Sequence, residues 1–131
     1  MKVLFVCFGN LCRSVIAEAI LKSKGHEAKS AGISTTPRLS TPLQVFRALQ
    51  KLGIVRAKRK PEALTPEMIE WADIIVATSD VFDFVKQKCC KKILCWNVPD
   101  PWGRDQEEYD NVAFLLERLV TDFLKKYNNT F

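Results

Sequence analysis

A cysteine and an arginine near the start of the chain form the pattern Cys-x5-Arg-Ser, with Cys7, Arg13 and Ser14. The cysteine ends an apolar run, so we expect it where a buried strand turns into a helix. Backbone N–H groups at a helix N-terminus, together with a guanidinium, bind a phosphate dianion. The same groups stabilise a thiolate and make it a nucleophile. The pattern therefore predicts a loop that binds phosphate and activates a thiol.

The residues that follow Cys7 would form the phosphate-binding loop. We expect their backbone N–H groups to converge on the phosphate oxygens while Arg13 binds two oxygens at once. Gly9 and Asn10 are residue types that tolerate the left-handed backbone such a loop requires. Ser14 could donate a hydrogen bond to the sulfur of Cys7. The loop consists of Phe8, Gly9, Asn10, Leu11, Cys12, Arg13 and Ser14.

Transfer of a phosphoryl group to sulfur also requires an acid that protonates the departing oxygen. Asp100 is the candidate, because Pro99 and Pro101 stiffen the loop on both sides of it. The adjacent Trp102 would exclude water and so favour the protonated carboxyl. The sole histidine, His26, follows a glycine in a predicted turn, and we interpret it as a surface residue.

Strand and helix patterns alternate along the chain and must position these residues. Thr41, Thr65 and Ser79 are candidate helix N-caps, and Gly25 and Gly53 are candidate helix stops. Strands are expected at 3–7, 27–31, 73–78 and 92–96, and helices at 14–24, 42–52, 66–71, in a short segment after Ser79 and at 106–127.

This alternation predicts a single-domain, three-layer α/β fold over residues 1–131, with a four-stranded parallel sheet and helices on both faces. Ligands of such sheets bind at the carboxyl ends of the strands. The first turn places Cys7 at that edge and the last turn places Asp100 there, so the fold would bring the thiol and the acid together.

The length of the apolar segments and the net charge limit the possible locations and partners of the protein. No apolar run approaches the roughly 20 residues of a membrane span, and the N-terminus does not have the pattern of a signal peptide. We therefore expect a cytoplasmic protein with no membrane partner. The net charge of +5 comes partly from basic clusters at 56–60 and 86–92. Because no aromatic residues interleave with them, they indicate solvated surface rather than nucleic-acid binding, and steering of a phosphorylated partner is the alternative.

The five cysteines do not indicate a structural framework. Their number is odd and the chain lacks a secretory signal, which argues against a set of disulfides. Cys89, Cys90 and Cys95 do not form the Cys-x2-Cys pairs of a structural zinc site. We expect neither a metal nor a cofactor, and interpret Cys89 and Cys90 as structural or incidental, while the role of Cys95 is open.

The segment Val6–Ser14, followed by Ile16-Ala17-Glu18-Ala19, resembles the low-molecular-weight protein tyrosine phosphatases. The resemblance extends over essentially the whole chain, through Ser30-Ala31-Gly32, the helix that starts at Thr65 and an Asp100-Pro101 pair followed by an aromatic residue. A bare Cys-x5-Arg pattern is shared by all cysteine phosphatases, whereas this combination is much more specific.

The resemblance implies a flavodoxin-like fold and a role for each matching residue. Cys7 would be the nucleophile, Arg13 would bind the phosphoryl group, and Asp100 would be the general acid. Asp100 would then activate the water that hydrolyses phospho-Cys7. The implied substrate is a phosphotyrosine-containing protein, the product is inorganic phosphate, and we expect a monomer.

The resemblance also assigns supporting roles. Asn10 and Ser14 would hold the loop and the thiolate, with Ser30 as a partner of Asn10. Cys12 would lie close to Cys7, and in this family such a pair can form a reversible disulfide that protects the nucleophile. A small buried side chain without redox function is an equally good interpretation of Cys12.

The chain departs from the family pattern in four places. Val15 stands where proline is usual, and a single Trp102 follows Asp100-Pro101 where many members have two tyrosines. The usual Ala-Arg pair is missing around 61–65. No histidine is available to join the Asn10 network, so the partners of Asn10 are open.

Phe8, Leu11 and Trp102 are placed to form a deep apolar slot around a planar ring. A phenyl phosphate reaches the bottom of such a slot, whereas phosphoserine is too short. Members that resemble protein arginine phosphatases carry threonine at the position of Leu11, so phosphotyrosine is favoured. Phe8 and Leu11 could instead belong to the core.

Three other classes fit less well. A thioredoxin-coupled arsenate reductase would need further redox cysteines after the third strand, and segment 76–80 has none. A silent phosphotyrosine-binding module would not need Asp100. A flavodoxin-like nucleotide-binding protein would need a glycine-rich or Ser/Thr-rich loop without cysteine.

Overall fold

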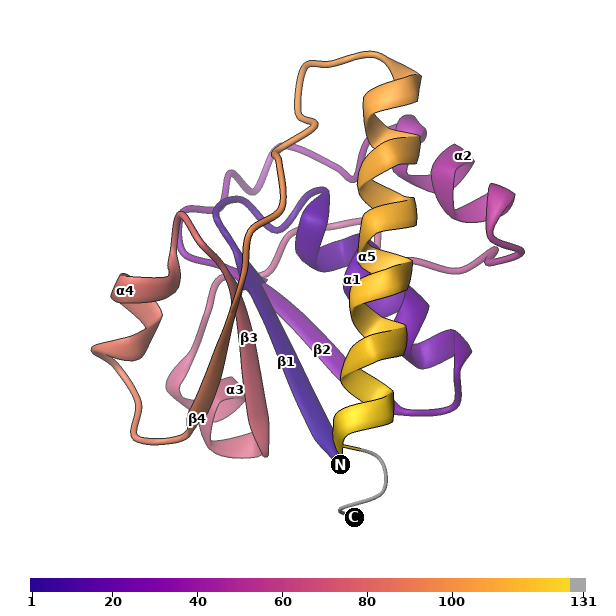
Figure 1. Cartoon of the computed structure of the whole chain (residues 1–131). Helices are drawn as coiled ribbons and strands as arrows, with labels where there is room; N and C mark the ends of the chain where they lie inside the picture. Colours follow the sequence, from indigo (N-terminus) through magenta and orange to yellow (C-terminus); the bar gives the residue numbers. More distant parts are fainter. Residues whose placement is uncertain (128–131) are drawn as a thin grey trace.

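The central sheet has four parallel strands in the order β2-β1-β3-β4 (Figure 1). The computed structural model describes residues 1–127 of the chain. The strands are β1 (Lys2–Cys7), β2 (Glu27–Gly32), β3 (Ile74–Thr78) and β4 (Lys92–Trp96). Strands β1 and β3 are buried on both faces, which explains why each is a nearly continuous apolar run.

Helices cover both faces of this sheet (Figure 1). Along β1, Val3 and Phe5 pack into the larger core with α1, α2 and α5, whereas Leu4 and Val6 pack on the other face near α3 and α4. This alternation follows from the two-residue repeat of a strand. The helices are α1 (Arg13–Ser23), α2 (Leu43–Lys51), α3 (Pro66–Trp71), α4 (Phe82–Lys86) and α5 (Gln106–Tyr127).

The expected fold class is confirmed, and most of the predicted elements end within one residue of their observed ends. Gly25 and Gly53 follow α1 and α2 with φ values of 87° and 79°, as expected of helix stops. The Thr65 side chain caps α3 by accepting from the Met68 N–H at 3.2 Å. Local cap chemistry was therefore a sound guide at these three ends.

Two predicted N-caps are wrong because their side chains have tertiary partners. The helix expected from Thr41 begins at Leu43, and the Thr41 hydroxyl donates to the carbonyl of Lys58 at 2.7 Å. Ser79 lies before α4 but does not cap it, since its hydroxyl donates to the Asn97 side chain at 3.2 Å.

The site lies where the strand order changes direction. Strand β1 has β2 on one side and β3 on the other, and the two crossovers leave a crevice at the carboxyl end of β1. The loop that follows Cys7 and the loop that follows β4 both reach this edge. Within residues 1–127, no helix has the length and apolarity needed to cross a membrane.

Candidate active site

The phosphate-binding loop begins at Cys7, whose side chain is almost completely buried. Asn10 has the expected left-handed backbone, with φ of 54°, and its N–H donates to the Cys7 sulfur at 3.3 Å. Gly9 does not adopt a positive φ, so that expectation was wrong. Room for the loop comes instead from Gly32, where a Cβ would lie 2.9 Å from three backbone atoms of the loop.

The sulfur of Cys7 and the hydroxyl of Ser14 lie 2.9 Å apart. Ser14 belongs to the first turn of α1, so the thiol also lies at the positive end of a helix dipole. These contacts place the backbone N–H of Asn10 and the hydroxyl of Ser14 against the sulfur.

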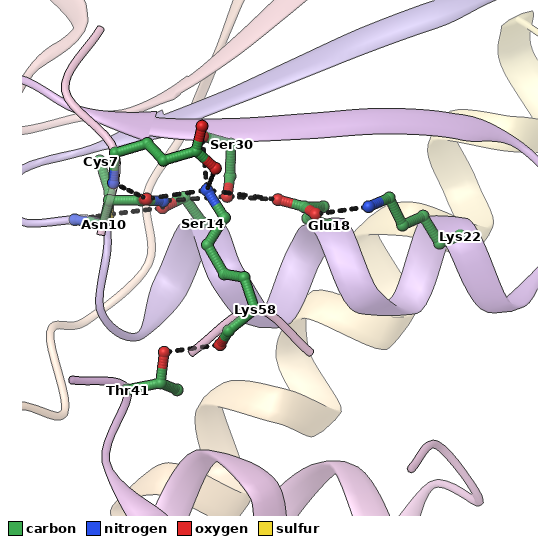
Figure 2. Close-up of polar contacts among 9 residues, drawn as sticks. Cys7, Asn10, Ser14, Glu18, Lys22, Ser30, Thr41 and Lys58 are labelled. Atoms are coloured by element: carbon green, nitrogen blue, oxygen red, sulfur yellow. Dashed lines mark hydrogen bonds and ion pairs between the residues drawn. The ribbon is translucent and has the colours of Figure 1, made fainter. Parts of the chain in front are cut away.

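The side chain of Asn10 joins loop, helix and sheet (Figure 2). Its amide nitrogen donates to Ser14 Oγ at 2.8 Å and to Ser30 Oγ at 2.9 Å. Its oxygen accepts from the Glu62 N–H at 2.8 Å and from Lys58 Nζ at 3.0 Å. Buried Asn10 therefore has partners for both its oxygen and its nitrogen.

Lys58 is a partner of Asn10 that the sequence did not reveal. The basic cluster at 56–60 was interpreted as solvated, but the Lys58 side chain is only 13 % exposed. It lies next to Glu18, a buried residue of α1 that accepts from Ser30 Oγ at 2.5 Å. Nothing local distinguishes Lys58 from its basic neighbours, because its contact with Asn10 is long-range.

Arg13 is buried and held by partners from β3–α4 and from the loop after β4. Its Nη1 and Nη2 donate to the two Asp80 carboxylate oxygens at 3.0 and 2.9 Å. Nη1 also donates to the Val98 carbonyl at 3.2 Å. Within residues 1–127, the N–H on Nε and the second N–H on Nη2 form no hydrogen bond. These two donors share one edge of the guanidinium, which suits two oxygens of a phosphate.

The pairing of Arg13 with Asp80 shifts the pKa values of both groups. Burial alone would lower the pKa of Arg13, but the hydrogen bonds to Asp80 and the nearby Cys7 raise it. Burial would likewise raise the pKa of Asp80, yet the hydrogen bonds from Arg13 hold it below its ordinary value. Asp80 was missed in the sequence, although a carboxylate just after a buried strand is a signal that could have indicated it.

Asp100 lies at the mouth of the pocket, with Oδ2 at 3.8 Å from Arg13 Nη2. Its Oδ1 accepts from the backbone N–H of Trp102 at 3.1 Å. The expectation that Trp102 would exclude water from this carboxyl is wrong for this structure. The Asp100 side chain is 52 % exposed, and Trp102 is itself about half exposed, because its ring lies at the rim.

The pocket above Cys7 has a volume of about 300 Å³ and includes every residue predicted as a wall. Leu11 is buried, whereas Phe8 and Trp102 are about half exposed and flank the entrance. The segment between β2 and α2 also lines the pocket, through Ser34, Thr36 and Leu39. The sequence did not indicate this, because no local pattern shows that this segment lies against the phosphate-binding loop. The lining residues are Cys7, Phe8, Gly9, Leu11, Cys12, Arg13, Ser34, Thr36, Leu39, Asp100 and Trp102.

Cys12 is buried beside the pocket and its thiol donates to Tyr109 Oη at 3.8 Å. Burial raises the pKa of Cys12 to about 12, so at neutral pH it is a thiol. Cys7 and Cys12 are both reduced in this structure, and a disulfide between them stays a prediction. Within residues 1–127, no cluster of three or more His, Cys, Asp or Glu side chains could hold a metal ion.

Two comparisons of sequence identify relatives of this chain. The family model for low molecular weight phosphotyrosine protein phosphatase matches residues 2–130. The low molecular weight protein-tyrosine-phosphatase Ptp of Acinetobacter johnsonii is 30% identical over 136 residues, covering 94% of this chain and 95% of that protein. A protein-arginine-phosphatase of Geobacillus stearothermophilus is 31% identical, covering 91% of this chain and 93% of that protein.

Solved structures also match this chain over nearly its whole length. The YwlE arginine phosphatase from Geobacillus stearothermophilus has a TM-score of 0.90 at 29% identity, covering 98% of this chain and 94% of that chain. A low molecular weight protein tyrosine phosphatase from T. tengcongensis has a TM-score of 0.84 at 30% identity, covering 96% and 99%. The predicted enzyme class, a phosphoric monoester hydrolase, is confirmed by these findings together with the family model. The chain belongs to the low molecular weight phosphotyrosine protein phosphatase family.

Proposed function

We propose that this phosphatase hydrolyses phosphotyrosine in proteins through a cysteinyl-phosphate intermediate on Cys7. The observation that carries the proposal is the convergence of Cys7, Arg13 and Asp100 on one pocket at the start of α1. That convergence gives a nucleophile at the base, an anion-binding guanidinium beside it and a carboxyl at the mouth.

In the first step, the Cys7 thiolate attacks phosphorus, the S–P bond forms and the bond from phosphorus to the phenolic oxygen breaks. Asp100 gives its proton to that departing oxygen. Arg13 binds two phosphoryl oxygens with its free edge while the loop N–H groups bind the rest. The thiolate can attack because donors from Asn10 and Ser14 stabilise its charge.

In the second step, Asp100 takes a proton from water, and the resulting hydroxide attacks phospho-Cys7. The S–P bond breaks, the thiolate returns and inorganic phosphate leaves. Donors around the sulfur favour this step too, since they make the thiolate a better leaving group. Neither step draws on a metal or a cofactor.

The pocket walls favour an aromatic substrate. Relatives of this chain include both tyrosine and arginine phosphatases, so the choice depends on this pocket. Leu11 offers no acceptor to the N–H groups of a phosphoguanidinium, which would lose hydration against it. The faces of Phe8 and Trp102 suit a phenyl ring at the entrance.

Three further points belong to the same proposal. Residues 1–131 form a single phosphatase domain, a view supported by a family match that covers 2–130. The enzyme acts as a cytoplasmic monomer on phosphorylated proteins. It has no nucleic-acid or membrane partner.

The test is a metal-free assay with EDTA present, from pH 4.5 to 8, on p-nitrophenyl phosphate, a phosphotyrosine peptide and a phosphoarginine peptide. Wild type and Cys7→Ser are compared. We expect turnover of the first two substrates in wild type and none in Cys7→Ser. Turnover that persists in Cys7→Ser would remove Cys7 as nucleophile, and a preference for phosphoarginine would overturn the proposed substrate.

A further inference from the structure

We propose that Lys58 and Glu18 are positioning residues that fix the direction of the hydrogen bonds leading to the Cys7 sulfur. The proposal rests on the function given above, because it explains how the nucleophile of that reaction is held as a thiolate. It gives a positioning role to two charged side chains that do not line the pocket above Cys7.

Lys58 fixes one end of the network because an ammonium group can only donate. Its nitrogen donates to Asn10 Oδ1 at 3.0 Å and to the Ser30 carbonyl at 2.9 Å, and it pairs with Glu62 at 2.7 Å. An ammonium has N–H bonds but no lone pair, so it offers no acceptor to a neighbouring donor. The atom of Asn10 that faces Lys58 must therefore be the amide oxygen.

Glu18 fixes the other end because a carboxylate can only accept. It lies between Lys22, at 2.8 Å, and Lys58, at 3.8 Å. The hydroxyl hydrogen of Ser30 must point to Glu18, across 2.5 Å. Ser30 Oγ is then left as an acceptor for the amide nitrogen of Asn10, which lies 2.9 Å away.

The direction of the remaining bonds follows from these two ends (Figure 2). Asn10 Nδ2 has two N–H bonds, one to Ser30 and one to Ser14 Oγ at 2.8 Å. Ser14 accepts from Asn10, so its own hydrogen is free to point to the Cys7 sulfur at 2.9 Å. In the opposite direction the thiol would have to donate to Ser14, and the thiolate would lose this donor.

The test measures how fast iodoacetamide alkylates Cys7 as a function of pH, with the modified residue identified by mass spectrometry. Lys58→Met removes the donor to Asn10. Lys58→Gln is neutral but keeps an N–H donor. Lys60→Met is the matched control, because Lys60 belongs to the same basic cluster and, within residues 1–127, its side chain donates only to the exposed Ser40. The values of kcat and KM for p-nitrophenyl phosphate are measured for the same proteins.

We expect the pH midpoint of Cys7 alkylation to rise by about 0.5 to 1 unit in Lys58→Met, as one lost hydrogen bond to sulfur predicts. The shift should be smaller in Lys58→Gln and absent in Lys60→Met. The value of kcat/KM should fall several-fold at low pH and approach the wild-type value at high pH. A structural role alone would lower kcat/KM at every pH and leave the midpoint unchanged.

The charged and titratable groups around the two sites must stay constant in this comparison. Cys7 lines one pocket with Arg13, Cys12 and Asp100, and Lys58 lies next to Glu18 and Glu62. The Lys58 and Lys60 variants leave all five groups in place.

An unchanged midpoint in Lys58→Met would overturn the proposal. An equal shift in Lys58→Gln and Lys58→Met would assign the effect to charge alone and overturn it as well. If Lys58→Met does not fold, Glu18→Gln replaces it, because its amide can donate to Ser30 and so removes the fixed direction. The same midpoint shift is expected there, and its absence counts against the proposal. If the midpoint shifts in Lys58→Met as expected but wild type hydrolyses neither p-nitrophenyl phosphate nor the phosphotyrosine peptide, the proposed function alone is refuted.

Discussion

Arg13 and Asp80 meet end to end, with Nη1 and Nη2 of the guanidinium 3.0 and 2.9 Å from the two carboxylate oxygens. Asp80 therefore binds the end of the guanidinium, next to the edge formed by Nε and Nη2. A planar guanidinium fixed in this way loses little further freedom when it binds a second bidentate partner. We therefore expect Asp80 to orient Arg13 without competing with the substrate.

Replacing Asp80 tests this orientation. In Asp80→Ala we expect kcat/KM for p-nitrophenyl phosphate to fall by about tenfold to a hundredfold, because a misplaced guanidinium loses alignment with the phosphoryl group. Phosphate should also inhibit less strongly. Asp83→Ala, an exposed carboxylate in the first turn of α4, is the control and should behave as wild type. Tighter phosphate inhibition in Asp80→Ala would show instead that Asp80 competes with the substrate.

The raised pKa of Cys12 predicts how stability depends on pH. Burial keeps the Cys12 thiol neutral in the folded protein up to a pKa of about 12, whereas in the unfolded chain a cysteine ionises near pH 8.5. Its contribution to stability is complete below about pH 8.5 and is lost as pH rises toward 12, by about 1.4 kcal/mol per unit in between.

Urea unfolding of wild type and Cys12→Ala from pH 7 to 10.5 measures this contribution. The stability advantage of wild type should shrink above about pH 8.5, because only wild type carries this thiol. A constant difference between the two proteins across that range would contradict the burial of a neutral Cys12.

Gly32 is required because the loop backbone lies against it. In Gly32→Ala the new Cβ would lie 2.9 Å from backbone atoms of the loop, so the loop or β2 must move. We expect a loss of about 1 to 3 kcal/mol and a melting temperature lower by several degrees. Gly9→Ala is the stability control, since its Cβ would meet only a Leu11 side-chain carbon at 3.8 Å. Equal melting temperatures for the two variants would contradict this packing.

Leu11 tests the choice of substrate. In Leu11→Thr we expect a fall of about tenfold in kcat/KM for a phosphotyrosine peptide and a rise for a phosphoarginine peptide, because a hydroxyl replaces apolar surface at the buried wall. The measurement is the ratio of kcat/KM for the phosphotyrosine peptide to kcat/KM for the phosphoarginine peptide, in wild type and in Leu11→Thr. If this ratio is the same in both proteins, Leu11 belongs to the core and does not determine specificity.

The sequence predicts those parts of the molecule that depend on neighbouring residues. Cys7, Asn10 and Ser14 lie close together along the chain, so one motif defines the loop and the thiol environment. Gly25 and Thr65 end or begin helices through contacts within a few residues. Parallel strand–helix units then bring Asp100 to the same edge.

The parts that sequence could not predict depend on contacts between distant segments. Lys58 reaches Asn10 from another segment, and Asp80 reaches Arg13 from beyond β3. The same kind of contact takes Thr41 away from its expected role as a cap. Where a polar side chain has both a local and a distant possible partner, only the fold decides which hydrogen bond forms, because local propensity does not show which distant residue lies near.

The most direct measurement of the central claim is the trapping of the phosphoenzyme. Asp100→Ala, which lacks the base for the second step, is mixed with p-nitrophenyl phosphate, whose leaving group needs little acid assistance. The reaction is quenched in acid and the protein is digested and analysed by mass spectrometry. We predict one phosphoryl group on Cys7. A phosphoryl group on another residue, or none during continuing turnover, would contradict the account.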